Sequence, residues 1–120
     1  MKLFLSTLLA ILYFYSVCQA APELWRISHY CACEKCCGKS DGITASGKKV
    51  QECHTVACNW LAFGTKVKIG NKVYIVEDRG AKSIFGSKSN HKKAIDIYCS
   101  SHKEALQKGI YYAEVELCQN

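Results

Sequence analysis

The residues that flank Asp96 in the sequence are of the kind expected around a catalytic acid. It is one of three aspartates in the 120-residue chain and lies in the largely apolar segment 94–99. In a strand, Ile95 and Ile97 point to one face of this segment and Asp96 points to the other, towards a surface or groove. Partial desolvation by the isoleucines and by Tyr98 raises the pKa of such a carboxyl group towards the working range of a general acid. The alternative is a structural aspartate that pairs with a nearby lysine or arginine.

Asp78 is the second candidate for this chemistry. It ends a candidate strand at 72–78, on the face shared by Tyr74 and Val76, and is followed directly by the turn Arg79-Gly80.

The cysteines offer a different chemistry, namely covalent cross-linking. An even number of cysteines in a short exported domain favours disulfides. So small a domain buries a limited fraction of its surface and therefore gains stability from cross-links. Two pairings suit the expected elements, Cys53 with Cys58 across a short loop and Cys99 with Cys118 between strand ends, although the connectivity stays open. The eight candidate disulfide residues are Cys31, Cys33, Cys36, Cys37, Cys53, Cys58, Cys99 and Cys118.

A metal site is the alternative use of the cysteines. The run Cys31-Ala32-Cys33-Glu34-Lys35-Cys36-Cys37, with His29 and His54 nearby, offers the thiolates and imidazoles that zinc prefers. The disulfides are favoured, because the N-terminal segment indicates export to an oxidising compartment. We therefore expect no metal and no cofactor.

Residues 1–20 have the pattern of a secretory signal peptide. Lys2 precedes an apolar run, 3–17, and the small residue Ala20 suits the cleavage position. The run is shorter than the roughly 20 residues that span a bilayer, so a retained membrane anchor is the less favoured alternative. We expect one domain over 21–120, no membrane span after cleavage, and a secreted, periplasmic or cell-wall-associated location.

Composition and charge narrow the class of partner. The chain is too short for a two-domain enzyme, and its 49% hydrophobic content is not that of a disordered chain. Without Lys2 it carries 15 basic and 10 acidic side chains, a net charge of +5, which favours polyanionic partners such as wall polymers. The lysines are scattered and not interleaved with aromatic residues, so we expect a monomer with no nucleic-acid partner.

Short strands dominate the expected secondary structure. Gly70-Asn71 joins two of them as a hairpin. The one convincing helix begins with a capping box at Ser101 and Glu104 and ends at Gly109. The pattern predicts a mainly β, disulfide-stabilised barrel of short strands with one short helix near the C-terminus. The candidate strands are 27–31, 55–58, 65–69, 72–78, 94–99 and 111–118.

Five motifs together resemble the bacterial three-aspartate (3D) domain, over residues 28–117. The resemblance implies a six-stranded double-psi β-barrel, as in the membrane-bound lytic transglycosylase A family, and cleavage of peptidoglycan glycan strands without a catalytic metal. The motifs are Tyr-Cys-Ala-Cys-Glu-Lys-Cys-Cys-Gly-Lys at 30–39, Asp-Gly-Ile-Thr-Ala-Ser-Gly at 41–47, Gly-Thr-Lys-Val-Lys-Ile at 64–69, Val-Glu-Asp-Arg-Gly at 76–80, and Ile-Asp-Ile-Tyr at 95–98 with Ser-His-Lys-Glu-Ala-Leu at 101–106.

The resemblance also implies roles for individual residues. Asp96 matches the family's general acid, and Asp78 matches the aspartate that lines the same cleft. Asn59 stands where the family has its first aspartate, and an amide can bind a sugar but cannot act as a base. The residues expected to bind substrate are Asn59, Thr44, Ser46, Tyr98 and Arg79.

The expected activity is that of a peptidoglycan lytic transglycosylase. In this reaction the 6-hydroxyl of muramic acid replaces water, so Asp96 alone serves as acid and then as base and leaves a 1,6-anhydro end. A hydrolase that uses Asp78 as its second carboxylate is one alternative. Others are a non-catalytic polysaccharide-binding module, as in barwin or expansins, and a small effector directed at another protein.

Overall fold

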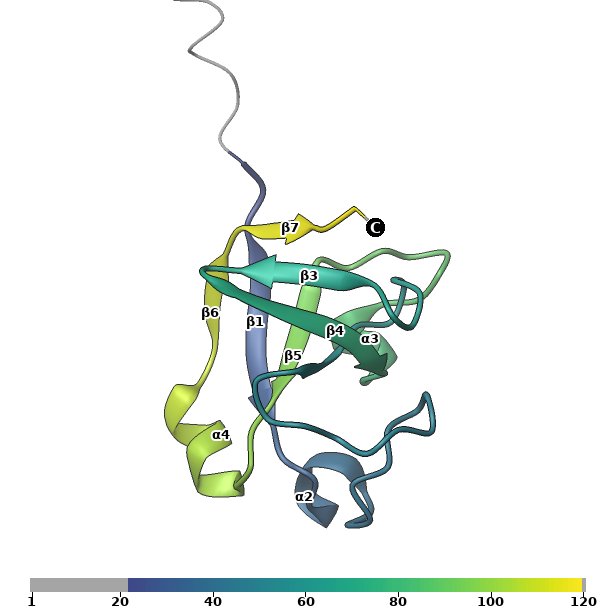
Figure 1. Ribbon diagram of the computed structural model, residues 1–120, viewed down its shortest axis with the longest axis vertical. Helices are drawn as coiled ribbons and strands as arrows, with labels where there is room; N and C mark the ends of the chain where they lie inside the picture. The colour runs from purple at the N-terminus through teal and green to yellow at the C-terminus, as the bar shows by residue number, and fades with distance from the viewer. Residues whose placement is uncertain (1–21, 120) are drawn as a thin grey trace, which may run out of the picture.

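The computed structural model describes residues 22–119, and the predicted signal peptide lies outside these residues. The described chain forms one sheet of seven strands and three short helices, which confirms the mainly β prediction. The strands are β1 (Trp25–Tyr30), β2 (Thr55–Ala57), β3 (Lys66–Ile69), β4 (Lys72–Asp78), β5 (Ala94–Tyr98), β6 (Tyr111–Ala113) and β7 (Val115–Leu117) (Figure 1). The helices are α2 (Glu34–Cys37), α3 (Lys82–Phe85) and α4 (His102–Lys108).

Local sequence signals place most of these elements correctly. β3 and β4 form the predicted antiparallel hairpin. The Ser101 hydroxyl accepts a hydrogen bond from the Glu104 N–H at 3.1 Å, so the expected cap begins α4, and Gly109 follows its last residue. Two expectations need correction. The segment 111–118 forms two strands because Glu114 interrupts the pairing, and α2 and α3 are additional helices of one turn each, too short to produce a periodic pattern.

The sheet combines parallel and antiparallel pairs. Its strand order is β6-β1-β5-β2-β4-β3-β7. β1 pairs with β5 and β2 with β4 in parallel, while the other neighbours are antiparallel. β6 and β7 lie at opposite ends of this order although only Glu114 separates them along the chain, so one short segment runs beside β1 and then beside β3 (Figure 1).

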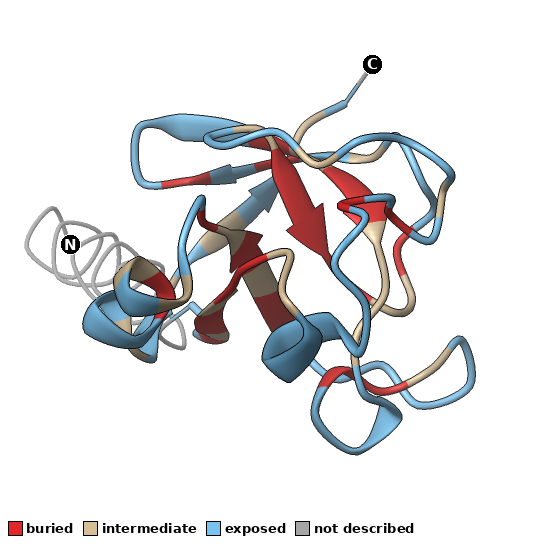
Figure 2. Ribbon diagram, turned by 90° about the horizontal axis from the view of Figure 1, so that it is seen from below, coloured by how far each residue is buried: buried red, intermediate tan, exposed pale blue. Residues whose placement is uncertain are grey.

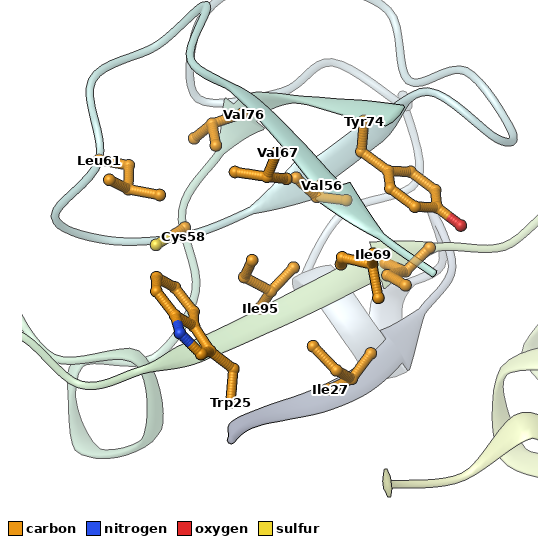
Figure 3. Packing of buried hydrophobic residues seen from close by; sticks show 11 residues of the cluster. Trp25, Ile27, Val56, Cys58, Leu61, Val67, Ile69, Tyr74, Val76 and Ile95 are labelled. Carbon is orange, nitrogen blue, oxygen red and sulfur yellow. The ribbon is translucent and has the colours of Figure 1, made fainter. Parts of the chain in front are cut away.

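Apolar side chains from all the central strands form one core. Ile27, Ile95, Val56, Val67 and Val76 are fully buried and pack together in Figure 3. Each such side chain contributes about 1.5–3 kcal/mol relative to an exposed one. Burial is concentrated on the strands, whereas the connecting loops are largely exposed (Figure 2).

The alternation predicted around Asp96 is confirmed. Ile95 and Ile97 lie in the core, and Asp96 between them is only partly buried. The same strand therefore anchors the sheet and presents a carboxyl group away from the core.

The cysteines of residues 22–119 are all free thiols in the structure. Neither of the two expected pairings is formed. Cys58 is buried while Cys53 is exposed, and Cys99 and Cys118 follow β5 and β7, which are not neighbours in the sheet. In the same residue range, no helix combines the length and apolar character that crossing a bilayer requires.

Candidate functional site

The strand register brings Asp78 and Asp96 to the two sides of one residue. Ala57 on β2 pairs with Asp78 on β4 and with Asp96 on β5. The pairing of β2 with β4 shifts between Val56 and Ala57, as in a β-bulge. Such irregularities redirect side chains next to active sites. The two carboxyl groups predicted to work together thus come from strands that flank β2.

A cavity of about 630 Å³ contains both aspartates and Ala57 in its lining. Its walls include Tyr30 from β1, the segment that carries α2, the loop at 39–45 and apolar side chains of α3. The small side chain of Ala57 leaves space between the carboxyl groups. This volume is in the range typical of small-molecule sites.

Asp96 is held by β1 and partly removed from water. The Ser28 hydroxyl donates a hydrogen bond to Asp96 Oδ1 at 2.9 Å, and the two residues are in register between β1 and β5. Burial raises the pKa of Asp96 from 3.8 to about 6, and the nearby charge of Asp78 adds to this increase. The Ser28 hydrogen bond and the Arg26 charge act in the opposite direction, with the smaller effect. Asp96 therefore has the protonation behaviour of a general acid near pH 6.

Asp78 accepts three hydrogen bonds, which fix its orientation. The Tyr30 hydroxyl donates to Oδ2 at 2.8 Å, and the N–H groups of Ala45 and Arg79 donate to Oδ1 at 2.9 Å each. Burial, followed by the charge of Asp78, raises the pKa of Tyr30 far above its ordinary value. Tyr30 therefore stays protonated and remains a donor.

Thr44 and Ser46 support the site from outside the cavity lining. Their hydroxyl groups are 2.8 Å apart, and the Ser46 N–H donates to the Glu77 carbonyl at 3.1 Å. Thr44 is buried. These contacts hold the turn that directs the Ala45 N–H at Asp78. The two residues therefore position the Ala45 N–H, and their direct binding of substrate stays a prediction.

Asn59 is also placed outside the cavity lining. Its side-chain amide donates to the carbonyls of Gly80 and Gly86, at 3.0 and 2.8 Å, and its oxygen accepts from the Gly80 N–H at 2.8 Å. Both amide hydrogens are used by the backbone on either side of α3. These hydrogen bonds attach the α3 segment to the sheet, and a contact of Asn59 with a sugar stays a prediction.

The two other predicted binding residues differ in position. Arg79 lines the cavity, and its guanidinium donates to the Cys58 carbonyl at 2.6 Å and lies 3.8 Å from the centre of the Phe63 ring. Tyr98 packs edge-on against Tyr30, with ring centres 5.8 Å apart, and is not part of the cavity lining. Only Arg79 of this pair is available to a ligand in the cavity.

Sequence reasoning missed Ser28 and Tyr30, which hold the two aspartates. Both lie on β1 two residues apart, so they project from the same face of the strand. The alternation of residues 25–30 indicates that Ser28 and Tyr30 share a face. It does not indicate their partners, because the contact of Ser28 with Asp96 depends on the parallel pairing of β1 with β5, which connects residues 68 positions apart.

A second group of chemically active side chains lies next to the cavity. Cys31, Cys33, Cys36 and His102 place one donor atom each within 4.8 Å of one another. The histidines considered from the sequence lie elsewhere, with His29 Nδ1 2.9 Å from the Gly109 carbonyl oxygen and His54 Nε2 2.7 Å from Glu77. These four side chains could hold a metal ion.

Comparison with known proteins assigns no family to this chain. The sequence matches no model of a known protein family and no curated protein. The features of the structure that indicate a function are therefore the paired carboxyl groups around Ala57 and the adjoining cysteine–histidine group.

Proposed function

We propose that this protein cleaves the glycan strands of peptidoglycan as a lytic transglycosylase of the 3D-domain type. The observation that carries the proposal is Asp96, whose pKa is raised to about 6 in a cavity that also contains Asp78. A carboxyl group with this pKa can donate a proton under mildly acidic to neutral conditions. The expected export, the location outside the cytoplasm and the polysaccharide partner are part of the same proposal.

The strand arrangement supports the corresponding fold, a six-stranded double-psi β-barrel. β6 and β7 count as one bent strand when the short interruption at Glu114 is disregarded. That strand pairs with β1 on one side and with β3 on the other, at the two ends of the sheet order. The two parallel pairs, β1 with β5 and β2 with β4, agree with this fold.

In the proposed reaction Asp96 acts twice. It first donates its proton to the glycosidic oxygen as the bond between that oxygen and the anomeric carbon of muramic acid breaks. The resulting carboxylate then accepts the proton of the muramic acid 6-hydroxyl, whose oxygen bonds to the same carbon and closes the 1,6-anhydro ring. Asp96 ends the cycle protonated, and no water is consumed.

Asp78 has the second role in this scheme. Its three hydrogen bonds hold it on the other side of Ala57, where a carboxylate stabilises the positive charge that develops on the sugar ring. If Asp78 instead activated water, the reaction would be hydrolysis and the product would keep a reducing end. The two reactions are therefore distinguished by their products.

Digestion of purified peptidoglycan sacculi tests the proposal. We expect the wild-type protein to release 1,6-anhydro-muropeptides, identified by mass spectrometry, and Asp96→Asn to release none. Glu116→Gln is the matched control, because it makes the same carboxyl-to-amide change on β7 outside the cavity lining. Reducing-end products would assign a hydrolase. Sedimentation with sacculi without release of fragments would overturn the enzyme proposal in favour of a binding module.

A further inference from the structure

Three cysteines of one short segment and a histidine 66 to 71 positions further along the chain converge on one point beside the cavity. Cys31 follows β1, Cys33 is the N-cap residue of α2, Cys36 lies in α2, and His102 begins α4. α2 and α4 lie at the same end of the molecule (Figure 1). His102 Nδ1 is 3.7, 3.6 and 3.4 Å from the sulfur atoms of Cys31, Cys33 and Cys36. The imidazole nitrogen is thus nearly equidistant from three sulfurs.

These separations are those of a tetrahedral ligand set. With Zn–S of about 2.3 Å and Zn–N of about 2.0–2.1 Å, a tetrahedron places sulfur and nitrogen about 3.5 Å apart and two sulfurs about 3.8 Å apart. The Cys31 sulfur is 3.6 Å from that of Cys36 and 3.0 Å from that of Cys33. Of these two sulfur–sulfur contacts, the one between Cys31 and Cys33 needs to widen when a metal ion is bound.

We propose that Cys31, Cys33, Cys36 and His102 form a structural zinc site with three thiolate ligands and one imidazole ligand. Three sulfurs and one nitrogen are a known donor set for structural zinc. Four protein ligands leave no open position for water or substrate, so the ion cross-links the chain and takes no part in catalysis.

A disulfide accounts less well for this arrangement. A disulfide joins two sulfurs at about 2.05 Å, whereas here three sulfurs surround a histidine nitrogen that has no role in such a bond. Cys37 is next to Cys36 in the chain but is not part of this ligand group. Its thiol donates a hydrogen bond to the Cys31 carbonyl at 3.2 Å, and its side chain lines the cavity instead.

The zinc ion would fix one wall of the cavity. Ala32, Cys36 and Cys37 line the cavity and belong to the segment that the ion would attach to α4. Cys36 is exposed and Cys33 partly exposed, so the metal has a path from solvent. This role does not depend on the reaction that occurs in the cavity.

Metal analysis of the full chain, as isolated after expression in zinc-supplemented medium, provides the first test. We expect one zinc per chain by mass spectrometry, and an X-ray absorption spectrum with three sulfur scatterers and one nitrogen scatterer. Cobalt(II) in place of zinc gives the visible absorption of a tetrahedral thiolate site. A protein that keeps free thiols yet binds no zinc, or a spectrum without sulfur ligands, would overturn the proposal.

Matched variants identify the ligands. Cys36→Ser and His102→Gln should weaken zinc binding by more than the roughly 10–100-fold that loss of an outer-shell partner costs. Cys53→Ser and His91→Gln, which alter exposed residues outside the group, should keep full zinc content. Thiol alkylation of the wild type, with and without a chelator, gives a readout that does not depend on variant folding. Chelation should expose Cys31, Cys33 and Cys36 together, whereas a disulfide among them would contradict the zinc site.

Discussion

Asp78 and Asp96 lie in register with the same residue, Ala57, from opposite sides of β2. Strands are spaced about 4.8 Å apart, so the two aspartates are fixed two strand widths from each other by backbone hydrogen bonds. Side-chain partners complete the arrangement. Tyr30 and Ser28, both on β1, hold one carboxyl group each.

The activity should depend on the protonated form of Asp96. Its pKa is raised to about 6, so the fraction of acid falls about tenfold per pH unit above that value. We expect kcat/KM for release of glycan fragments to decline with this slope from about pH 6 upwards. Circular dichroism over the same range checks that the fold is intact. A constant rate from about pH 5 to pH 8 would contradict the assignment of Asp96 as the acid.

Asp96→Asn should stabilise the protein while abolishing its activity. Because the folded-state pKa is raised from 3.8 to about 6, the wild type loses stability as pH rises through this window, by up to about 3 kcal/mol. Asparagine does not titrate and still accepts the Ser28 hydrogen bond. The stability advantage of the variant should therefore be small at about pH 3 and largest at about pH 8. Urea denaturation at several pH values measures it, and a pH-independent difference would refute the expectation.

Tyr30→Phe removes the hydroxyl that holds Asp78 but keeps the ring that packs on Tyr98. Hydrogen bonds to charged groups contribute about 1.5–3 kcal/mol, so we expect kcat to fall about 10- to 100-fold. Tyr74→Phe is the control, because Tyr74 is a buried core tyrosine outside the cavity lining. Equal effects of the two variants would indicate that Tyr30 acts only through packing.

Asn59→Asp should destabilise the protein instead of restoring a catalytic aspartate. The Asn59 amide donates to the Gly80 and Gly86 carbonyls, and a carboxylate there would face both oxygens without a hydrogen to donate. We expect a loss of about 2–4 kcal/mol in unfolding free energy at neutral pH. Partial recovery should follow in acid, where the protonated carboxyl group donates once. Asn71→Asp, in the exposed hairpin turn, should have little effect.

Ala57→Val tests whether the space between the carboxyl groups is the reaction site. Ala57 is 1% exposed and lines the cavity, so two added methyl groups occupy the position between Asp78 and Asp96. We expect activity to fall at least about tenfold, and thermal denaturation to show a loss of stability of about 1–3 kcal/mol. Ala62→Val, at an exposed loop position outside the cavity lining, is the control. Undiminished activity in Ala57→Val would place the chemistry elsewhere.

Local patterns were sufficient for the elements themselves. The alternation around Asp96, the hairpin at Gly70 and the cap at Ser101 each depend on residues two to four positions apart, and all three are found in the structure. The one-turn helices α2 and α3 were missed because one turn carries no periodic signal.

The roles of several polar residues depended on distant parts of the chain. The Asn59 amide donates to the backbone carbonyls of Gly80 and Gly86, 21 and 27 positions away, and no pattern in the sequence indicated these contacts. His102 gave no sign of joining the cysteines, which lie 66 to 71 positions before it. Spacing along the chain does not encode such contacts, because they form only when the strands pair.

The sequence alone therefore determined a mainly β domain, the strand that presents Asp96, and the two aspartates worth testing, since these follow from short-range alternation and capping. The tertiary structure decided the rest. Parallel pairing of β1 with β5 and of β2 with β4 joins segments far apart in the chain. Together with the antiparallel pairing of β2 with β5, it places Asp78 and Asp96 around Ala57 and gives them Tyr30 and Ser28 as partners. His102 reaches the three cysteines only in the folded chain.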